Sequence, residues 1–249
     1  MKISESEIML RRAWITQLYK EHKNICWNYK VDLSKPIIEI FNNQKNLGQW
    51  ISKFKTIKID LTLIQDYSWD VVINILKHEM AHQIVHEIFN CDDKHGEVFI
   101  KACSMIGVPE EFRSASGDIH YSVKKIVEKR FDSDNAKMLE KVRKLLSLAK
   151  SPNENEAFLA MKKAHELIEK HNIKQIEQND GSRYVYEIIT HKKKRIESSQ
   201  RRICSILLDF YFVDIVYSYL FDPVSCQTYK TIEILGSPEN VKIAQHVYF

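Results

Sequence analysis

The residues best suited to chemistry in this chain are His78 and His82, which lie four positions apart, and Glu79 between them. On an α-helix this spacing places both imidazoles on one face, so that they can converge on a single metal ion. Glu79 points about 100° further round the helix, which suits it to reach a water molecule held by the metal rather than to bind the ion. The pattern His-Glu-x-x-His therefore indicates a zinc hydrolase with a glutamate as general base.

The segment 69–89 is expected to form the helix that carries this pattern. It contains no glycine or proline, Ser68 stands where an N-cap is needed, and Asp70 lies in the first turn. Apolar residues occupy almost every direction around the segment, which predicts a helix that is buried on most sides. Buried polar side chains without partners destabilise a fold, and a metal ion would give the histidines and the glutamate a partner.

A catalytic zinc ion has three protein ligands and one position for water, so a third ligand must come from another segment. His95 is the best placed, because the turn-forming residues 90–93 break the chain before it. The helix expected to begin near Gly96 can then pack back on the first helix and return His95 to the site. Three alternative third ligands remain open, and they are His86, Glu97 and Glu110.

The segment HEMAH, followed after a short spacer by HGEVF, resembles the SprT-like (Spartan-type) zinc metallopeptidases. The strand-like segments 36–40 and 56–60 also resemble the small sheet that precedes the active-site helix in that family. The resemblance implies a zincin-like peptidase domain with one Zn²⁺ ion and a protein or peptide as substrate. The site residues that it assigns are His78, His82 and His95 as zinc ligands and Glu79 as the catalytic general base.

The elements expected before the active-site helix are a helix over 5–23 and strands over 37–41, 49–54 and 56–61. The strands alternate enough to predict a hairpin or a meander with one face in solvent. A strand beside the active-site helix would allow a substrate peptide to pair along its edge. After the site, three donors are available to stabilise an oxyanion, and they are Arg113, His120 and Tyr121.

The second half of the chain begins after a polar boundary at 124–134, with helices expected over 138–149 and 154–170. This helical hairpin resembles a small domain of unknown function found in bacterial and phage proteins, and that resemblance brings no activity with it. Beyond it, strands are expected over 184–190, 213–219 and 228–235. Helices are expected over 200–210 and from residue 238 onward.

The fold class expected for the whole chain is α+β, with a peptidase domain, a helical hairpin and a small α/β C-terminal unit. The predicted divisions are a peptidase domain at 1–123, a linker at 124–134, the hairpin domain at 135–178 and the C-terminal domain at 179–249. Hydrophobic residues make up 44% of the chain and charged residues 28%, with no stretch long and apolar enough for a membrane span. We therefore expect no membrane partner and a cytoplasmic location. The five cysteines include no CxxC pair, which indicates reduced thiols and a reducing compartment.

The strongest cluster of positive charge follows the strand expected at 184–190, with further cations at Arg201 and Arg202. One interpretation is a solvated loop, because the net charge of the chain is only +4. The other is a patch over 192–202 that contacts the phosphates of a nucleic acid, so that the peptidase acts on nucleic-acid-associated proteins. The residues of this hypothesis are Lys192, Lys193, Lys194 and Arg195.

A second functional class is a zinc-stabilised binding or adaptor protein without proteolytic activity. In that class the C-terminal domains would contact nucleic acid or protein, while the zinc ion would only hold the fold together. Structural zinc sites have four protein ligands and favour cysteine. A fourth ligand such as Cys91 would therefore favour this alternative over a peptidase.

Overall fold

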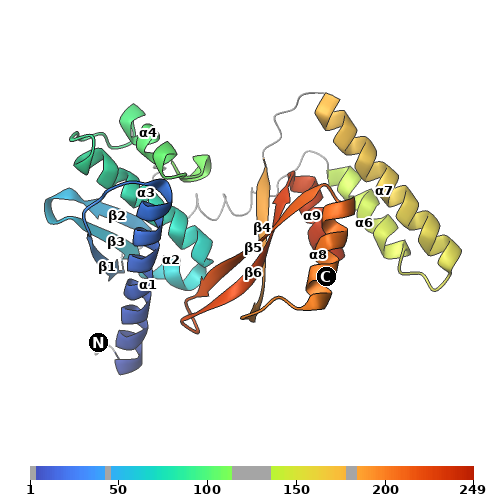
Figure 1. Cartoon of the computed structure of the whole chain (residues 1–249), viewed down its shortest axis with the longest axis horizontal. Coiled ribbons are helices and arrows are strands. Elements are labelled where there is room, and N and C mark those ends of the chain that lie inside the picture. The colour runs from blue at the N-terminus through green and yellow to red at the C-terminus, as the bar shows by residue number, and fades with distance from the viewer. Residues whose placement is uncertain (1–3, 43–45, 114–135, 178–183) are drawn as a thin grey trace. The chain divides into compact units, whose positions relative to one another are not determined.

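The computed structural model describes residues 4–42, 46–113, 136–177 and 184–249. The described part mixes helices with two small three-stranded sheets, which confirms the predicted α+β class (Figure 1). The chain divides into two compact units, one formed by Met1–Ile126 with Leu220–Thr228 and the other by Val127–Tyr219 with Tyr229–Phe249. Among the described residues, no helix combines the length and the apolar character that a bilayer crossing requires.

The first unit begins with the long helix α1 (Glu5–Tyr29), followed by strands β1 (Ile37–Phe41), β2 (Gly48–Ile51) and β3 (Thr56–Asp60). The strand order is β1-β3-β2, with β2 antiparallel and β1 parallel to β3. The expected hairpin is present as β2–β3, but the parallel pairing of β1 with β3 excludes a meander. Strand β2 consequently lies at an edge of its sheet.

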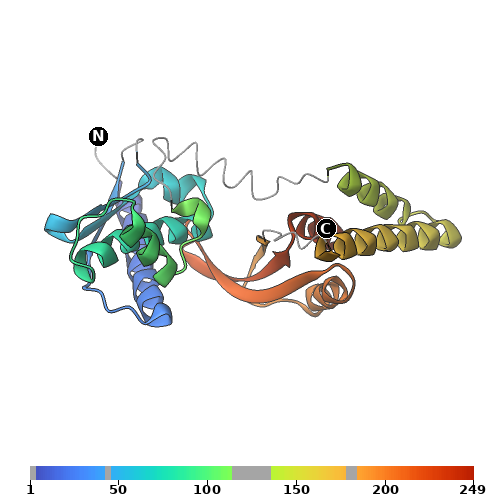
Figure 2. The ribbon, with the colours of Figure 1, turned by 90° about the horizontal axis from the view of Figure 1, so that it is seen from above.

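Helix α3 (Trp69–Glu87) is the central helix of the first unit and follows the short helix α2 (Leu61–Asp66). It contacts α1, β2 and α4 (Glu97–Met105), and most of its side chains are buried, as its apolar pattern predicts. Ser68 stands at the N-cap position, but its hydroxyl bonds the carboxylate of Asp70 and makes no capping bond to the backbone. Helix α3, which carries the His-Glu-x-x-His pattern, therefore packs against several other elements of the first unit, whose ribbon is seen from above in Figure 2.

The C-terminal end of α3 is fixed by a polar network that links it to the segment before β1. The carboxylate of Glu87 accepts hydrogen bonds from the backbone N–H and the hydroxyl of Ser34, and from the amide of Gln83. Gln83 also donates to the Ser34 carbonyl at 2.8 Å and bonds the buried His22 ring of α1 at 3.2 Å. Burial opposes the charge on Glu87, but the bonds from Ser34 and Gln83 outweigh it and lower the pKa of this carboxyl group.

The second unit contains most of a sheet of order β4-β6-β5, in which β4 (Val185–Lys193) is antiparallel to β6 (Gln227–Gly236). Strand β5 covers Val213–Asp222. The helices of this unit are α6 (Ala136–Leu148), α7 (Glu154–Glu177), α8 (Ser198–Phe210) and α9 (Pro238–Tyr248). The helical hairpin α6–α7 shares one hydrophobic core with the sheet and with α8 and α9.

Helix α7 continues to Glu177, beyond residue 170, where the sequence predicted its end. Asn172 does not cap the helix, because its side chain is buried and bonds both the Ile168 carbonyl and the amide of Asn240 on α9. The Asn240 amide returns a hydrogen bond of 2.7 Å to Asn172. A buried amide pair with these partners is satisfied inside the helix, so the sequence signal for a helix end is overridden by tertiary contacts. The predicted linker at 124–134 lies outside the described residues, and the predicted domain divisions stay a prediction.

Candidate metal centre

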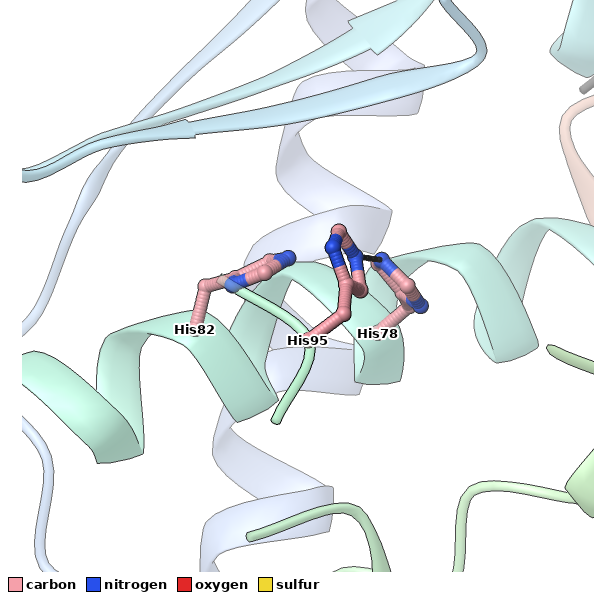
Figure 3. Close-up of side chains that lie close together, drawn as sticks. All are labelled: His78, His82 and His95. Carbon is pink, nitrogen blue, oxygen red and sulfur yellow. Dashed lines mark hydrogen bonds between the residues drawn. The ribbon is translucent and has the colours of Figure 1, made fainter. Parts of the chain in front are cut away.

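Three histidine side chains from two segments converge beside the edge of the first sheet (Figure 3). His78 and His82 project from one face of α3, one turn apart, and His95 comes from the segment that leads into α4. One ring nitrogen of each histidine lies within 4.8 Å of the others, and the Nε2 atoms of His78 and His95 are 3.3 Å apart. In the part of the chain that the structure describes, no other group of histidine, cysteine, aspartate or glutamate side chains meets this criterion.

The His78 ring is oriented by the short helix Glu110–Phe112. Its Nδ1 atom lies 2.7 Å from the carbonyl oxygen of Phe112, and because a carbonyl only accepts, Nδ1 carries the proton. Nε2 of His78 therefore presents its lone pair to the centre of the cluster. A backbone carbonyl behind a ligating histidine is a usual way to fix its tautomer and ring orientation in metal sites.

The three imidazoles are neutral at neutral pH. Burial lowers the pKa of His78 to about 4 and that of His82 to about 3, and for His82 the neighbouring imidazoles act in the same direction. Burial also lowers the pKa of His95. Neutral imidazole is the form of histidine that binds a metal, so the cluster is in the correct protonation state for a ligand set.

The segment that carries His95 is folded around the carboxylate of Asp93. This carboxylate accepts hydrogen bonds from the backbone N–H groups of Gly96, Val98 and Phe99, at 2.6, 2.9 and 3.3 Å. It thereby satisfies donors at the N-terminus of α4 that have no partner within the helix. A Cβ atom at Gly96 would lie only 2.5 Å from the same carboxylate, which explains why glycine follows the histidine.

Glu79 is buried next to strand β2, with 5% of its surface exposed. Burial raises the pKa of its carboxyl group to about 8, against a hydrogen bond from the backbone N–H of Trp50 that favours the charged form. A Cβ atom built on Gly48 would lie 2.6 Å from Glu79 Oε1 and 2.9 Å from Ile75 Cγ2. Strand β2 therefore approaches α3 closely enough to hold the carboxylate, a contact that the sequence did not predict.

A cleft of about 690 Å³ contains the histidine cluster and Glu79, and one wall of it comes from β2. Trp50 and His86, which both line this cleft, contact each other edge-on, with ring centroids 6.4 Å apart. The pocket also reaches the segment between α3 and His95. The side chains and backbone that line it outside the histidine cluster belong to Asn46, Gly48, Gln49, Trp50, Ser52, Glu79, Val85, His86, Cys91, Asp92, Asp93 and Lys94.

The alternative ligands considered from the sequence do not join the cluster. His86 and Cys91 line the cleft without belonging to the group of converging donors, and Glu97 and Glu110 do not line the cleft. Arg113, one of the predicted oxyanion donors, uses its Nε atom to bond the Val108 carbonyl at 2.9 Å. The other two predicted donors, His120 and Tyr121, lie outside the described residues.

The basic segment predicted to contact nucleic acid lies in the second unit, at the end of β4 and before α8. The four cationic residues 192–195 are exposed. Lys193 forms an ion pair with Glu197, and Glu197 caps α8 through a capping box with Gln200. The structure therefore places part of this positive charge in a local helix-capping arrangement.

One histidine pair has the separation expected of two ligands on the same metal ion. Four ligands placed about 2.0–2.1 Å from zinc at the corners of a tetrahedron lie about 3.3 Å from one another, which is the separation of the two Nε2 atoms of His78 and His95. Three neutral imidazoles, one oriented by a backbone carbonyl, form a donor set that zinc prefers. The cluster of His78, His82 and His95 can therefore bind a metal ion.

Comparison with known families gives two matches along the chain. Residues 15–119 match the SprT-like family, and residues 137–175 match a family described as a protein of unknown function, DUF2786. Comparison with curated proteins and with solved structures gave no match. The segment that holds the histidine cluster therefore matches the SprT-like family, and a segment that matches DUF2786 follows it. Both resemblances seen in the sequence are confirmed.

Proposed function

We propose that this protein is a zinc-dependent metallopeptidase of SprT-like type, with His78, His82 and His95 as zinc ligands. The observation that carries the proposal is the meeting of three neutral imidazoles with one buried carboxylate, Glu79, in a single cleft. The SprT-like match covers all four residues. A zinc ion in this place would supply a Lewis acid that polarises the scissile carbonyl and lowers the pKa of water toward neutrality.

Glu79 is the general base of the proposed reaction. Its carboxylate takes a proton from the attacking water molecule and returns it to the nitrogen of the leaving amine. The burial that raises its pKa makes the ionised form of Glu79 a stronger base than a solvated carboxylate. The backbone N–H of Trp50 donates a hydrogen bond to the carboxylate at the wall of the cleft. Gly48, which has no side chain, leaves the space that the carboxylate occupies.

The proposed substrate is an extended protein or peptide segment. Strand β2 pairs with β3 on one side only and lines the cleft. A substrate strand can therefore add to its outer edge through main-chain hydrogen bonds. Such binding uses the peptide backbone, which every polypeptide offers, and leaves sequence preference to the side chains that face the cleft.

The test of this function is reversible removal of the metal. We expect the zinc-loaded full chain to cleave an unfolded polypeptide such as casein. Mass spectrometry of the fragments would identify the new N-termini. Treatment with a chelator and dialysis should abolish cleavage, and one equivalent of Zn²⁺ should restore it. Cleavage that persists after the bound zinc has been removed would contradict the proposal.

Nucleic-acid binding through the basic segment 192–202 is a separate proposal, supported by the exposed side chains of Lys192, Lys194 and Arg195. We expect replacement of all four cations at 192–195 by glutamine to weaken binding to single-stranded DNA in a fluorescence anisotropy titration. The slope of log K against log salt should flatten by about 0.7 for each phosphate that the variant no longer neutralises.

The control for this titration is a variant with the same charge change on α6 of the same unit. The cations to be replaced are Lys137, Lys141, Arg143 and Lys144. An equal loss of affinity in both variants would indicate a general effect of net charge. Unchanged affinity in the variant of residues 192–195 would show that the basic segment does not bind nucleic acid.

A further inference from the structure

One buried aromatic ring contacts all three histidines of the metal centre. The centroid of the Phe99 ring lies 4.3 Å from that of His82, and the two planes are stacked at 29°. It lies 5.0 Å from the ring of His78 and 4.7 Å from the ring of His95, both edge-on. The Phe99 side chain has no exposed surface, so the three imidazoles rest on a single ring that faces away from solvent.

The Phe99 ring is held in place from its own helix. Phe99 lies four residues after His95 in the first turn of α4, where its backbone N–H bonds the Asp93 carboxylate. The same face of α4 contributes the buried side chains of Ala102 and Cys103, and α4 contacts α3 along this side. The ring is therefore fixed by the backbone of α4 and by the core, independently of the histidines.

The contacts of Phe99 restrict how the histidine rings can turn. The stacked contact limits rotation of the His82 ring, and the edge-to-face contacts limit rotation of the His78 and His95 rings. The three histidine rings also lie 4.9–5.3 Å from one another. A ligand set whose rotamers are fixed before the metal arrives loses less freedom on binding, and so binds more tightly.

We propose that Phe99 is a positioning residue of the metal centre, which sets the rotamers of His78, His82 and His95 so that their nitrogens converge. This inference rests on the proposed function in one respect, since it requires that the three histidines bind zinc. It adds a reason for the phenylalanine that follows the His-Gly pair in HGEVF. The ring supplies a flat face, and a branched aliphatic side chain of similar volume does not.

The experiment measures metal binding by the full chain and does not depend on a peptidase assay. We expect Phe99→Leu to bind Zn²⁺ about 10-fold more weakly than the parent, in competition with a chromogenic chelator. With Co²⁺ in place of zinc, the visible absorption bands should shift or lose intensity, because the imidazoles no longer hold one geometry. Leu18→Ala, which removes buried volume from α1, a helix that does not line the cleft, is the control and should change neither reading.

The readings separate this inference from the proposed function. A parent chain that binds no zinc would overturn both, whereas a Phe99→Leu variant with parental zinc affinity and parental Co²⁺ bands would overturn only the role of Phe99. Phe99→Met fills the same space without a flat face, and it should weaken binding as well if the leucine variant does not fold. In the metal-free parent, the ring current of the stacked Phe99 side chain should shift the NMR signals of the His82 ring protons upfield. His82 ring protons without this upfield shift would also overturn the inference.

Discussion

Replacement of Glu79 by glutamine is expected to lower kcat by about 10²–10⁴-fold while zinc stays bound. Glutamine has nearly the same shape, so its carbonyl oxygen can still accept the Trp50 N–H, but it cannot take a proton from water. The three ligands are unchanged, and zinc content by mass spectrometry should equal that of the parent. A Glu79→Gln variant with parental kcat would remove Glu79 from the mechanism.

The matched control for this experiment is Glu87→Gln, the same substitution two turns later on the same helix. The Glu87 carboxylate faces Ser34 and Gln83 and does not line the cleft, so kcat should stay at the parental value. We expect a loss of about 1–2 kcal/mol in the free energy of unfolding, since the amide replaces a charged acceptor of hydrogen bonds. The two variants thus separate loss of the base from loss of stability in α3.

Replacement of Gly48 by alanine is expected to lower kcat by about 10²-fold through displacement of Glu79. The added methyl group would meet Glu79 Oε1 at 2.6 Å and Ile75 Cγ2 at 2.9 Å, and one of these groups must move. The carboxylate is at the end of a flexible side chain and will give way first. The zinc affinity should not change, because the atoms nearest to the added methyl group belong to Glu79 and Ile75 and not to a histidine.

A double-mutant cycle distinguishes displacement of the base from a general disturbance of the sheet. If Gly48→Ala acts through Glu79, the double variant should have nearly the same kcat as Glu79→Gln alone. Independent, additive losses in kcat would show instead that the methyl group acts on strand β2 and on substrate binding. Thermal unfolding of each variant establishes that the comparison is made on folded protein.

The sequence was sufficient to predict the helix that carries His78 and His82 and the segment that supplies His95, for reasons of periodicity and turn chemistry. The apolar pattern over 69–89 fits a helix closely, and the structure places α3 at Trp69–Glu87. The break at 90–93 allows the chain to reverse, as expected, and His95 lies beside His78 in the structure. These are local signals, and local signals can be read from one sequence.

The features that the sequence did not predict depend on long-range contacts. Gly48 looks like a weak strand residue until β2 is placed against α3, although a glycine inside a strand can mark a close backbone approach. Asp93 looks like part of a turn, whereas its carboxylate organises the N-terminus of α4. Asn172 looks like a helix end, but its partner is Asn240, far along the chain.

The most direct test of the proposed zinc site is the first coordination shell of bound zinc, measured by X-ray absorption spectroscopy on the full chain loaded with one equivalent. We predict three imidazole nitrogens and one oxygen from water at about 2.0–2.1 Å. His95→Ala should remove one of the imidazoles and sharply weaken zinc binding. A shell of four protein ligands that includes a sulfur at about 2.3 Å, such as that of Cys91, would contradict a peptidase and favour a structural zinc site.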